Sequence, residues 1–111
     1  MLIKSDKEIN HLAGADVYFK CENLQNSGSF KFRGASNAVF SLNDEEARRG
    51  VITVSSGNHG TALSLAAKNR GIPATVILPS NATNYKKTLI FDPLKVLVSW
   101  TPKMVRLQKG F

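Results

Sequence analysis

The sequence predicts an α/β fold in which helices flank a parallel β-sheet. A β-branched run at 51–55 and an apolar run at 74–78 are separated by a helical pattern at 61–70. Strand, helix and strand at this spacing are typical of a βαβ unit, whose two strands lie parallel in one sheet. Apolar residues make up 42% of the 111 residues. The chain is therefore able to bury a core, as one small domain or as part of a larger one.

The first fifty residues predict one strand and two helices. Residues 1–16 are polar and weakly patterned, with Gly14 marking a turn, and the aromatic and β-branched run at 17–22 predicts a strand. Apolar residues at helical spacing predict a helix from near Lys31 to about Leu42. A second, short helix should follow, because Asn43 and Glu46 have the spacing of a capping box and Gly50 closes the segment.

The remainder predicts the βαβ unit and its continuation. The helix at 61–70 should stop at Gly71, with one face formed by Ala62, Leu65, Ala66 and Asn69. Pro79 should end the second strand. Asn81 or Thr83 is a candidate cap for one more helix through Phe91, and residues 95–100 have the composition of a third strand. Residues 101–111 show no clear period.

Charge and composition argue against several function classes. The net charge of +7 belongs mostly to the tail, since residues 1–83 carry nine Lys/Arg against seven Asp/Glu and residues 84–111 carry six against one. These tail cations are scattered, without the clustered stripe of a nucleic-acid site. No apolar run reaches the length of a membrane span. A lone Cys21 and the absence of a leader pattern lead us to expect a reducing, cytoplasmic setting.

Lys31 is the first candidate functional residue. It follows a stretch containing glycine and serines and should lie where a loop turns into a helix. The first N–H groups of a helix point outward with partial positive charge, which suits an amine nucleophile. Most lysines at such positions are solvated surface charges, and that alternative stays open from Lys31 alone. Arg33 is expected to pair with an acidic group.

The segment Ser-Ser-Gly-Asn-His-Gly at 55–60 is the second candidate. It joins a predicted parallel strand to a helix, where glycines and the helix start favour binding of a carboxylate or phosphate. The nucleotide-binding glycine patterns are absent, and a plain connecting turn is the alternative. The backbone N–H of His59 is expected to matter more than its ring, because no further ligand stands at metal-binding spacing. No metal site is predicted.

Taken together, Ser-Phe-Lys-Phe-Arg-Gly-Ala at 29–35 and the segment at 55–60 resemble the serine racemase and serine/threonine dehydratase family. Members are pyridoxal-phosphate enzymes of the fold shared with tryptophan synthase β-chains, called fold type II. The resemblance weakens gradually across residues 17–87 and implies a partial three-layer α/β fold. It also implies racemisation or β-elimination, with release of ammonia, acting on serine or threonine.

The resemblance implies roles by position. Lys31 would hold pyridoxal 5'-phosphate as a Schiff base and remove the substrate α-proton, and Ser56 would be the acid/base group on the opposite face. Phe30 would pack against the cofactor ring, and Asn58 would hydrogen-bond its 3-hydroxyl oxygen. The substrate carboxylate would be bound by the backbone of the loop residues Ser55, Ser56, Gly57, Asn58 and His59.

The chain departs from the family in length. Family members are much longer, and their glycine-rich phosphate cradle, the partner of the pyridine nitrogen and the carboxylates for a divalent cation lie beyond Phe111. Divalent cation and ATP therefore belong to a full-length relative. The implied division is 1–50 for the start of the large cofactor domain, 51–100 for most of the small domain, and 101–111 for a divergent tail. Tyr85 and Asp92-Pro93 also depart from the family pattern.

We therefore expect a truncated family member that acts on a small amino acid and forms a homodimer when complete. Two alternatives stay open. One is a non-catalytic remnant that associates with a full-length homologue, and the other is an unrelated small binding module. A truncated sheet would expose apolar surface and unpaired edges, which predicts marginal stability and association.

Overall fold

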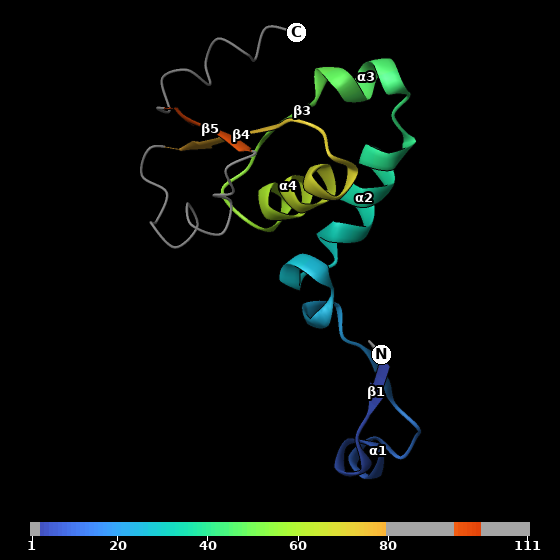
Figure 1. Ribbon diagram of the computed structural model, residues 1–111. Helices are drawn as coiled ribbons and strands as arrows, with labels where there is room; N and C mark the ends of the chain where they lie inside the picture. The colour runs from blue at the N-terminus through green and yellow to red at the C-terminus, as the bar shows by residue number, and fades with distance from the viewer. Residues whose placement is uncertain (1–2, 80–94, 101–111) are drawn as a thin grey trace, which may run out of the picture.

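The computed structural model describes residues 3–79 and the backbone of residues 95–100 (Figure 1). Its main body contains a parallel sheet of three strands in the order β3 (Val51–Val54), β4 (Ala74–Pro79) and β5 (Lys95–Trp100). Val51 pairs with Ala74, and Ala74 pairs with Lys95. The predicted α/β class, the parallel pairing and the third strand are confirmed. The helix expected from Asn81 or Thr83 to Phe91 lies outside the described residues.

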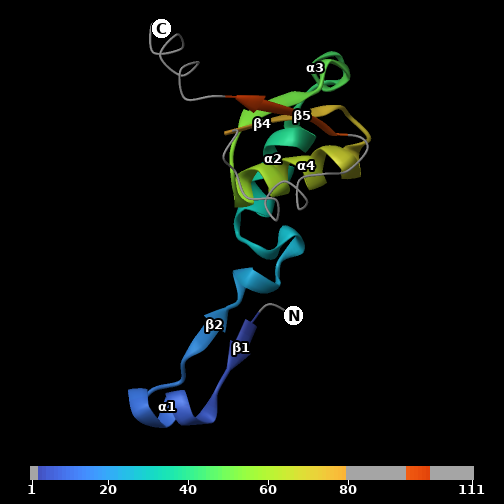
Figure 2. The same ribbon diagram turned by 90° about the vertical axis from the view of Figure 1, so that its left-hand side faces the viewer.

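Two helices cover one face of this sheet in successive layers. Helix α4 (Asn58–Arg70) packs on β3 and β4, and α2 (Lys31–Ser41) packs on α4 from the other side. Figures 1 and 2 show this order from two directions. The core between the two helices consists of small and medium apolar residues: Ala35, Val39, Ala62, Leu63 and Ala66. Helix α4 is therefore apolar on two sides, because it lies between the sheet and α2.

This double contact corrects the face predicted for α4. Ala62 and Ala66 are buried as expected, but Leu65 is only partly buried and Asn69 is exposed. The buried set extends round the helix through Leu63, Ser64 and Ala67. A single amphipathic stripe describes a helix that packs on one neighbour, whereas α4 has two. The helix also begins at Asn58, three residues before the predicted start.

The short helix α3 (Asp44–Arg49) has the predicted capping box. The Asn43 side chain accepts a hydrogen bond from the Glu46 N–H at 2.9 Å, and the Glu46 carboxylate accepts one from the Asn43 N–H at 3.0 Å. Gly50 ends the helix with a φ of 81°. A side chain there would also collide with the carbonyl oxygen of Pro73. Both the backbone conformation and the available space therefore require glycine.

Residues 3–29 form a small unit that projects from the main body (Figure 2). Strands β1 (Ile3–Ser5) and β2 (Tyr18–Lys20) pair antiparallel, and helix α1 (Lys7–Ala13) lies between them in the chain, at the far end of the pair. Two short 3₁₀ turns follow, η1 (Glu22–Leu24) and η2 (Asn26–Gly28). The sequence predicted β2 and the turn at Gly14, but β1 and α1 were missed. Both have local signals, since Asp6 caps α1 and Gly14 ends it at a φ of 63°.

Two sequence expectations bear on this arrangement. The predicted domain boundary near residue 50 stays a prediction, although α2 and α4 from its two sides share one core. The exposed apolar surface expected of a partial sheet is present. Ile52 and Val54 point away from α4 and are 68% and 54% exposed. Among the described helices, none combines the length and apolar character needed to cross a bilayer.

Arg70 ties the ends of the two packed helices together. Helix α2 ends at Leu42 in extended conformation, without the glycine that ends α1, α3 and α4. The Arg70 guanidinium, at the end of α4, donates hydrogen bonds to the carbonyl oxygens of Val39 and Leu42, the latter at 2.7 Å. The side chain is only 16% exposed. A cation at a helix C-terminus satisfies carbonyl groups that lack intrahelical partners.

We predict that Arg70→Met lowers the free energy of unfolding by about 1–3 kcal/mol, because two carbonyl groups lose a charged donor. Urea denaturation followed by circular dichroism measures this. The matched control is Arg49→Met, which removes an exposed arginine paired with Glu45 on α3 and should change stability by less than about 0.5 kcal/mol. Equal effects of the two substitutions would contradict the role of Arg70.

Candidate active site

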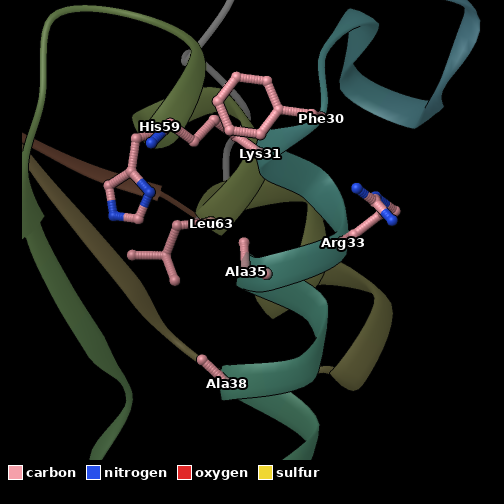
Figure 3. Close-up of a pocket in the computed structure, with 8 residues that line it drawn as sticks. Phe30, Lys31, Arg33, Ala35, Ala38, His59 and Leu63 are labelled. Atoms are coloured by element: carbon pink, nitrogen blue, oxygen red, sulfur yellow. The ribbon is translucent and has the colours of Figure 1, made fainter. Parts of the chain in front are cut away.

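A pocket of about 460 Å³ opens between the N-terminal halves of α2 and α4. It is shown in Figure 3, and its walls are mostly apolar apart from one ammonium, one guanidinium and one imidazole. The lining residues are Phe30, Lys31, Arg33, Gly34, Ala35, Ala38, His59 and Leu63. Because the two helices point their first turns toward the same pocket, it combines apolar surface with partial positive charge.

Lys31 is the first residue of α2, as the sequence predicted. Its side chain extends from α2 toward His59 (Figure 3), and its Nζ lies 5.0 Å from the centre of the Phe30 ring. Phe30 immediately precedes the helix and makes no side-chain capping bond. Phe30 is 55% exposed, so part of its surface is accessible beside the amine. The structure thus places an amine and an aromatic surface together at the pocket.

The loop at 55–60 connects β3 to the start of α4. The Ser55 hydroxyl oxygen accepts hydrogen bonds from the N–H groups of Gly57 and Gly60, at 3.3 and 3.0 Å. This fixes the turn that leads into the helix. Gly57 caps α4 without any side-chain bond. The next N–H groups of the helix have no intrahelical partner, which is the property that anion binding requires.

The structure brings only some of the predicted site residues to the pocket wall. Phe30, Lys31 and His59 line it, whereas Ser55, Ser56, Gly57 and Asn58 do not. Ser56 is half-buried in the turn, and Asn58 is exposed at the first position of α4. The roles given to these residues stay predictions. They lie on the short loop next to His59, which is the part of α4 that faces Lys31.

Several pocket residues were missed from the sequence as site residues. Gly34, Ala35 and Ala38 lie on α2 and Leu63 on α4. The helical spacing of Ala35, Ala38, Val39 and Leu42 was noticed, but only as evidence for a helix after Lys31. Small residues one and two turns after the lysine keep the space beside its side chain open, and that spacing is the signal that would have found them.

Arg33 pairs with an acidic group, as expected. Its guanidinium lies 3.1 Å from Glu22 Oε1, and Lys20 Nζ lies 3.5 Å from the same oxygen. Glu22 belongs to η1, so this contact links the N-terminal unit to the first turn of α2. Within the described residues, no group of three or more histidine, cysteine, aspartate or glutamate side chains is arranged to hold a metal ion.

Comparisons with known proteins agree on one family. Residues 2–91 match the family model described as pyridoxal-phosphate dependent enzyme. The chain is 53% identical over 88 residues to serine racemase of Dictyostelium discoideum, covering 79% of this chain and 27% of that protein. It is 51% identical over 88 residues to beta-hydroxyaspartate dehydratase of Paracoccus denitrificans, covering 79% and 28%.

A solved structure gives the same result for the fold. The crystal structure of serine racemase from Dictyostelium discoideum superposes with a TM-score of 0.86 at 42% identity, covering 96% of this chain and 36% of that one. The chain therefore has the shape of about a third of that structure. It spans about a quarter of the length of the curated relatives that it matches.

We predict that Ser55→Ala lowers the free energy of unfolding by about 1–2 kcal/mol, since two loop N–H groups lose their acceptor. Amide hydrogen exchange should locate the change, with faster exchange at Gly57 and Gly60. Ser41→Ala is the control, because the Ser41 hydroxyl bonds only the carbonyl oxygen of Asn37 on an exposed face. Unchanged exchange at Gly60 in Ser55→Ala would refute the proposed support of the loop.

Proposed function

The chain belongs to the family of pyridoxal-phosphate-dependent enzymes, and we propose that it forms part of an enzyme that racemises serine or eliminates ammonia from hydroxy amino acids. The observation that carries this proposal is the Lys31 amine in a pocket, beside Phe30 and opposite the start of α4. The names of the relatives support the reaction class, as one is a serine racemase and another a beta-hydroxyaspartate dehydratase.

The residues present fit pyridoxal 5'-phosphate. A primary amine is the group that condenses with its aldehyde, and Lys31 supplies one at the pocket. The Phe30 ring lies beside that amine, with part of the residue's surface accessible for contact with an aromatic cofactor. Asn58 stands at the start of α4, where we propose that its amide holds the cofactor hydroxyl. When bound, this cofactor supplies an electron sink that stabilises the carbanion left by α-proton removal.

The two groups proposed to transfer protons lie at the starts of different helices. Lys31 Nζ is proposed to take the α-proton on one face of the substrate, since it reaches across the pocket from α2. Ser56 lies in the turn before α4, and we assign its hydroxyl to the opposite face. Return of the proton from Ser56 gives the D-amino acid. Loss of the β-hydroxyl instead leads to a keto acid and ammonia.

The loop at 55–59 is proposed to bind the substrate carboxylate through its backbone. Ser55 already orients this loop by accepting two N–H groups, so the remaining donors at the start of α4 are fixed in direction. A carboxylate at a helix N-terminus is stabilised by those N–H groups and by the helix dipole. A carboxylate site fits an amino acid, and the resemblance to serine racemases and threonine dehydratases leads us to propose serine or threonine as the substrate.

The wider assignments rest on the resemblance. We propose a cytoplasmic protein, in keeping with the single free Cys21, and a homodimer in its complete form. No site for a divalent cation or ATP is proposed on this chain. An alternative is a non-catalytic remnant that binds a full-length homologue through β3, whose Ile52 and Val54 are exposed. Co-purification with such a homologue, together with a failure to react with the cofactor, would favour it.

We predict that the purified chain incubated with pyridoxal phosphate develops an absorption band that depends on Lys31. Lys31→Ala should abolish the band, because Lys31 carries the only amine among the described residues that line the pocket. Lys7→Ala, which removes an exposed lysine of α1, should retain it. An identical spectrum for the parent chain and Lys31→Ala would exclude a competent site in this chain.

The assignment of Ser56 is tested in a complete fold. Residues 1–91 of this chain replace the matching segment of the Dictyostelium serine racemase, and both reactions are followed with L-serine. Ser56→Ala should lower D-serine formation by at least a hundredfold, the low end for loss of a general acid–base group, and spare pyruvate formation. Ser41→Ala is the control. Equal loss of both products in Ser56→Ala would defeat the role given to this hydroxyl.

A further inference from the structure

Helix α2 begins without the stabilising groups that the other short helices have. Asp6 caps α1 with its side chain, and α3 has both a capping box and three acidic residues in its first turn. The first turn of α2 has no acidic residue and no side-chain cap. It instead carries two cations, Lys31 and Arg33, at the positive end of the helix dipole. Cations there are unfavourable, so another group must hold this turn in place.

Glu22 places a negative charge beside the first turn of α2. Its Oε1 lies 3.1 Å from the Arg33 guanidinium and 3.5 Å from Lys20 Nζ, and both carboxylate oxygens are buried, although the side chain as a whole is 21% exposed. A buried carboxylate is stable only when a charge partner and hydrogen-bond donors lie close. The requirement is mutual, because Glu22 needs a cation and the start of α2 needs an anion. The pair thus joins η1 to the first turn of α2.

The connecting chain is folded so as to permit this contact. Ser27 and Gly28 have φ values of 63° and 71°, so two successive residues take the left-handed conformation between η1 and α2. That conformation is unfavourable for serine and persists when the surroundings require it. The reversal brings Glu22 back toward Arg33, although eleven positions separate them in the sequence. The bend and the ion pair therefore act as one unit.

Arg33 and Lys31 leave α2 on different sides. Figure 3 shows Lys31 directed toward His59 and Arg33 projecting away from it. The Arg33–Glu22 contact restrains the rotation of the first helical turn, and that rotation sets the direction in which Lys31 leaves the helix. Lys31 Nζ then lies over the Phe30 ring. The direction of the amine thus depends on a carboxylate that does not line the pocket.

We propose that Glu22 is a positioning residue, which acts through Arg33 to hold the first turn of α2 and to direct the Lys31 amine into the pocket. The importance of this role for catalysis rests on the function proposed above for Lys31. The positioning itself is a property of the chain without cofactor, so the two proposals can fail separately.

The test is a nuclear magnetic resonance measurement on chain carrying ¹³C-labelled lysine, without pyridoxal phosphate. Because Lys31 lies over the Phe30 ring, the ring current should shift its side-chain proton signals upfield of those of the other lysines. Lys31→Arg assigns the signal by removing it. Glu22→Gln keeps the size of the side chain and removes its charge, and we expect the upfield shift to be lost. Arg33→Gln should have the same effect.

A matched control variant and a folding readout distinguish positioning from general destabilisation. Glu45→Gln is the matched control, since it removes the carboxylate of the exposed Glu45–Arg49 pair on α3 and should leave the Lys31 signal in place. The methyl signals of Val76 and Leu78, buried in β4, report whether each variant is folded.

Three results would overturn the proposal. They are an upfield Lys31 signal that persists in Glu22→Gln, a loss of that signal in Glu45→Gln, or a Lys31 signal that is not displaced in the parent chain. If Glu22→Gln does not fold, Arg33→Gln alone decides, because the same shift must be lost there. A Lys31-dependent absorption band that forms in the parent chain while the shift persists in Glu22→Gln would retain the proposed function and reject the positioning role.

Discussion

The contact between α2 and α4 is the constraint on which the rest of the structure depends. Ala35 and Val39 on one helix meet Ala62 and Ala66 on the other, and all four are at most 4% exposed. Small side chains let two helices approach closely, so the first turns of both reach one pocket. Three of these four residues are alanines, so Val39 and the neighbouring Leu63 are the main protruding groups that oppose sliding or rotation of the helices. Packing brings the site together, and contacts at the ends of α2 add to its restraint.

Polar contacts at the two ends of α2 add directional restraints to the apolar packing. At its C-terminal end, Arg70 of α4 bonds two carbonyl oxygens, and at its N-terminal end Arg33 pairs with Glu22. The first contact opposes sliding of the helices, and the second opposes rotation of the turn that carries Lys31. A reactive amine must be held to within a fraction of an ångström to be useful. Directional hydrogen bonds and ion pairs meet that requirement better than apolar contact does.

Much of this arrangement followed from the sequence because its signals are local. The capping box at Asn43, the glycine ends and the βαβ spacing each act over a few residues, and the structure has all of them. The family was recognised from two short blocks around Lys31 and Ser56. The buried faces of α4 were predicted only in part, because they depend on which neighbours the helix meets. The pairs Glu22–Arg33 and Arg70–Val39 join residues far apart in sequence and had no signal beyond a general expectation for Arg33.

The reaction type is harder to assign than the family, because the two candidate reactions share their first step. Racemisation and elimination both begin with removal of the α-proton, so the role proposed for Lys31 would serve either outcome equally. They diverge in what happens to the carbanion, and that depends on groups on the far side of the substrate. In this chain, the group that we propose there is Ser56, half-buried in the turn that Ser55 orients. The turn between β3 and α4 is therefore the part of the described structure in which a preference between the two reactions would reside.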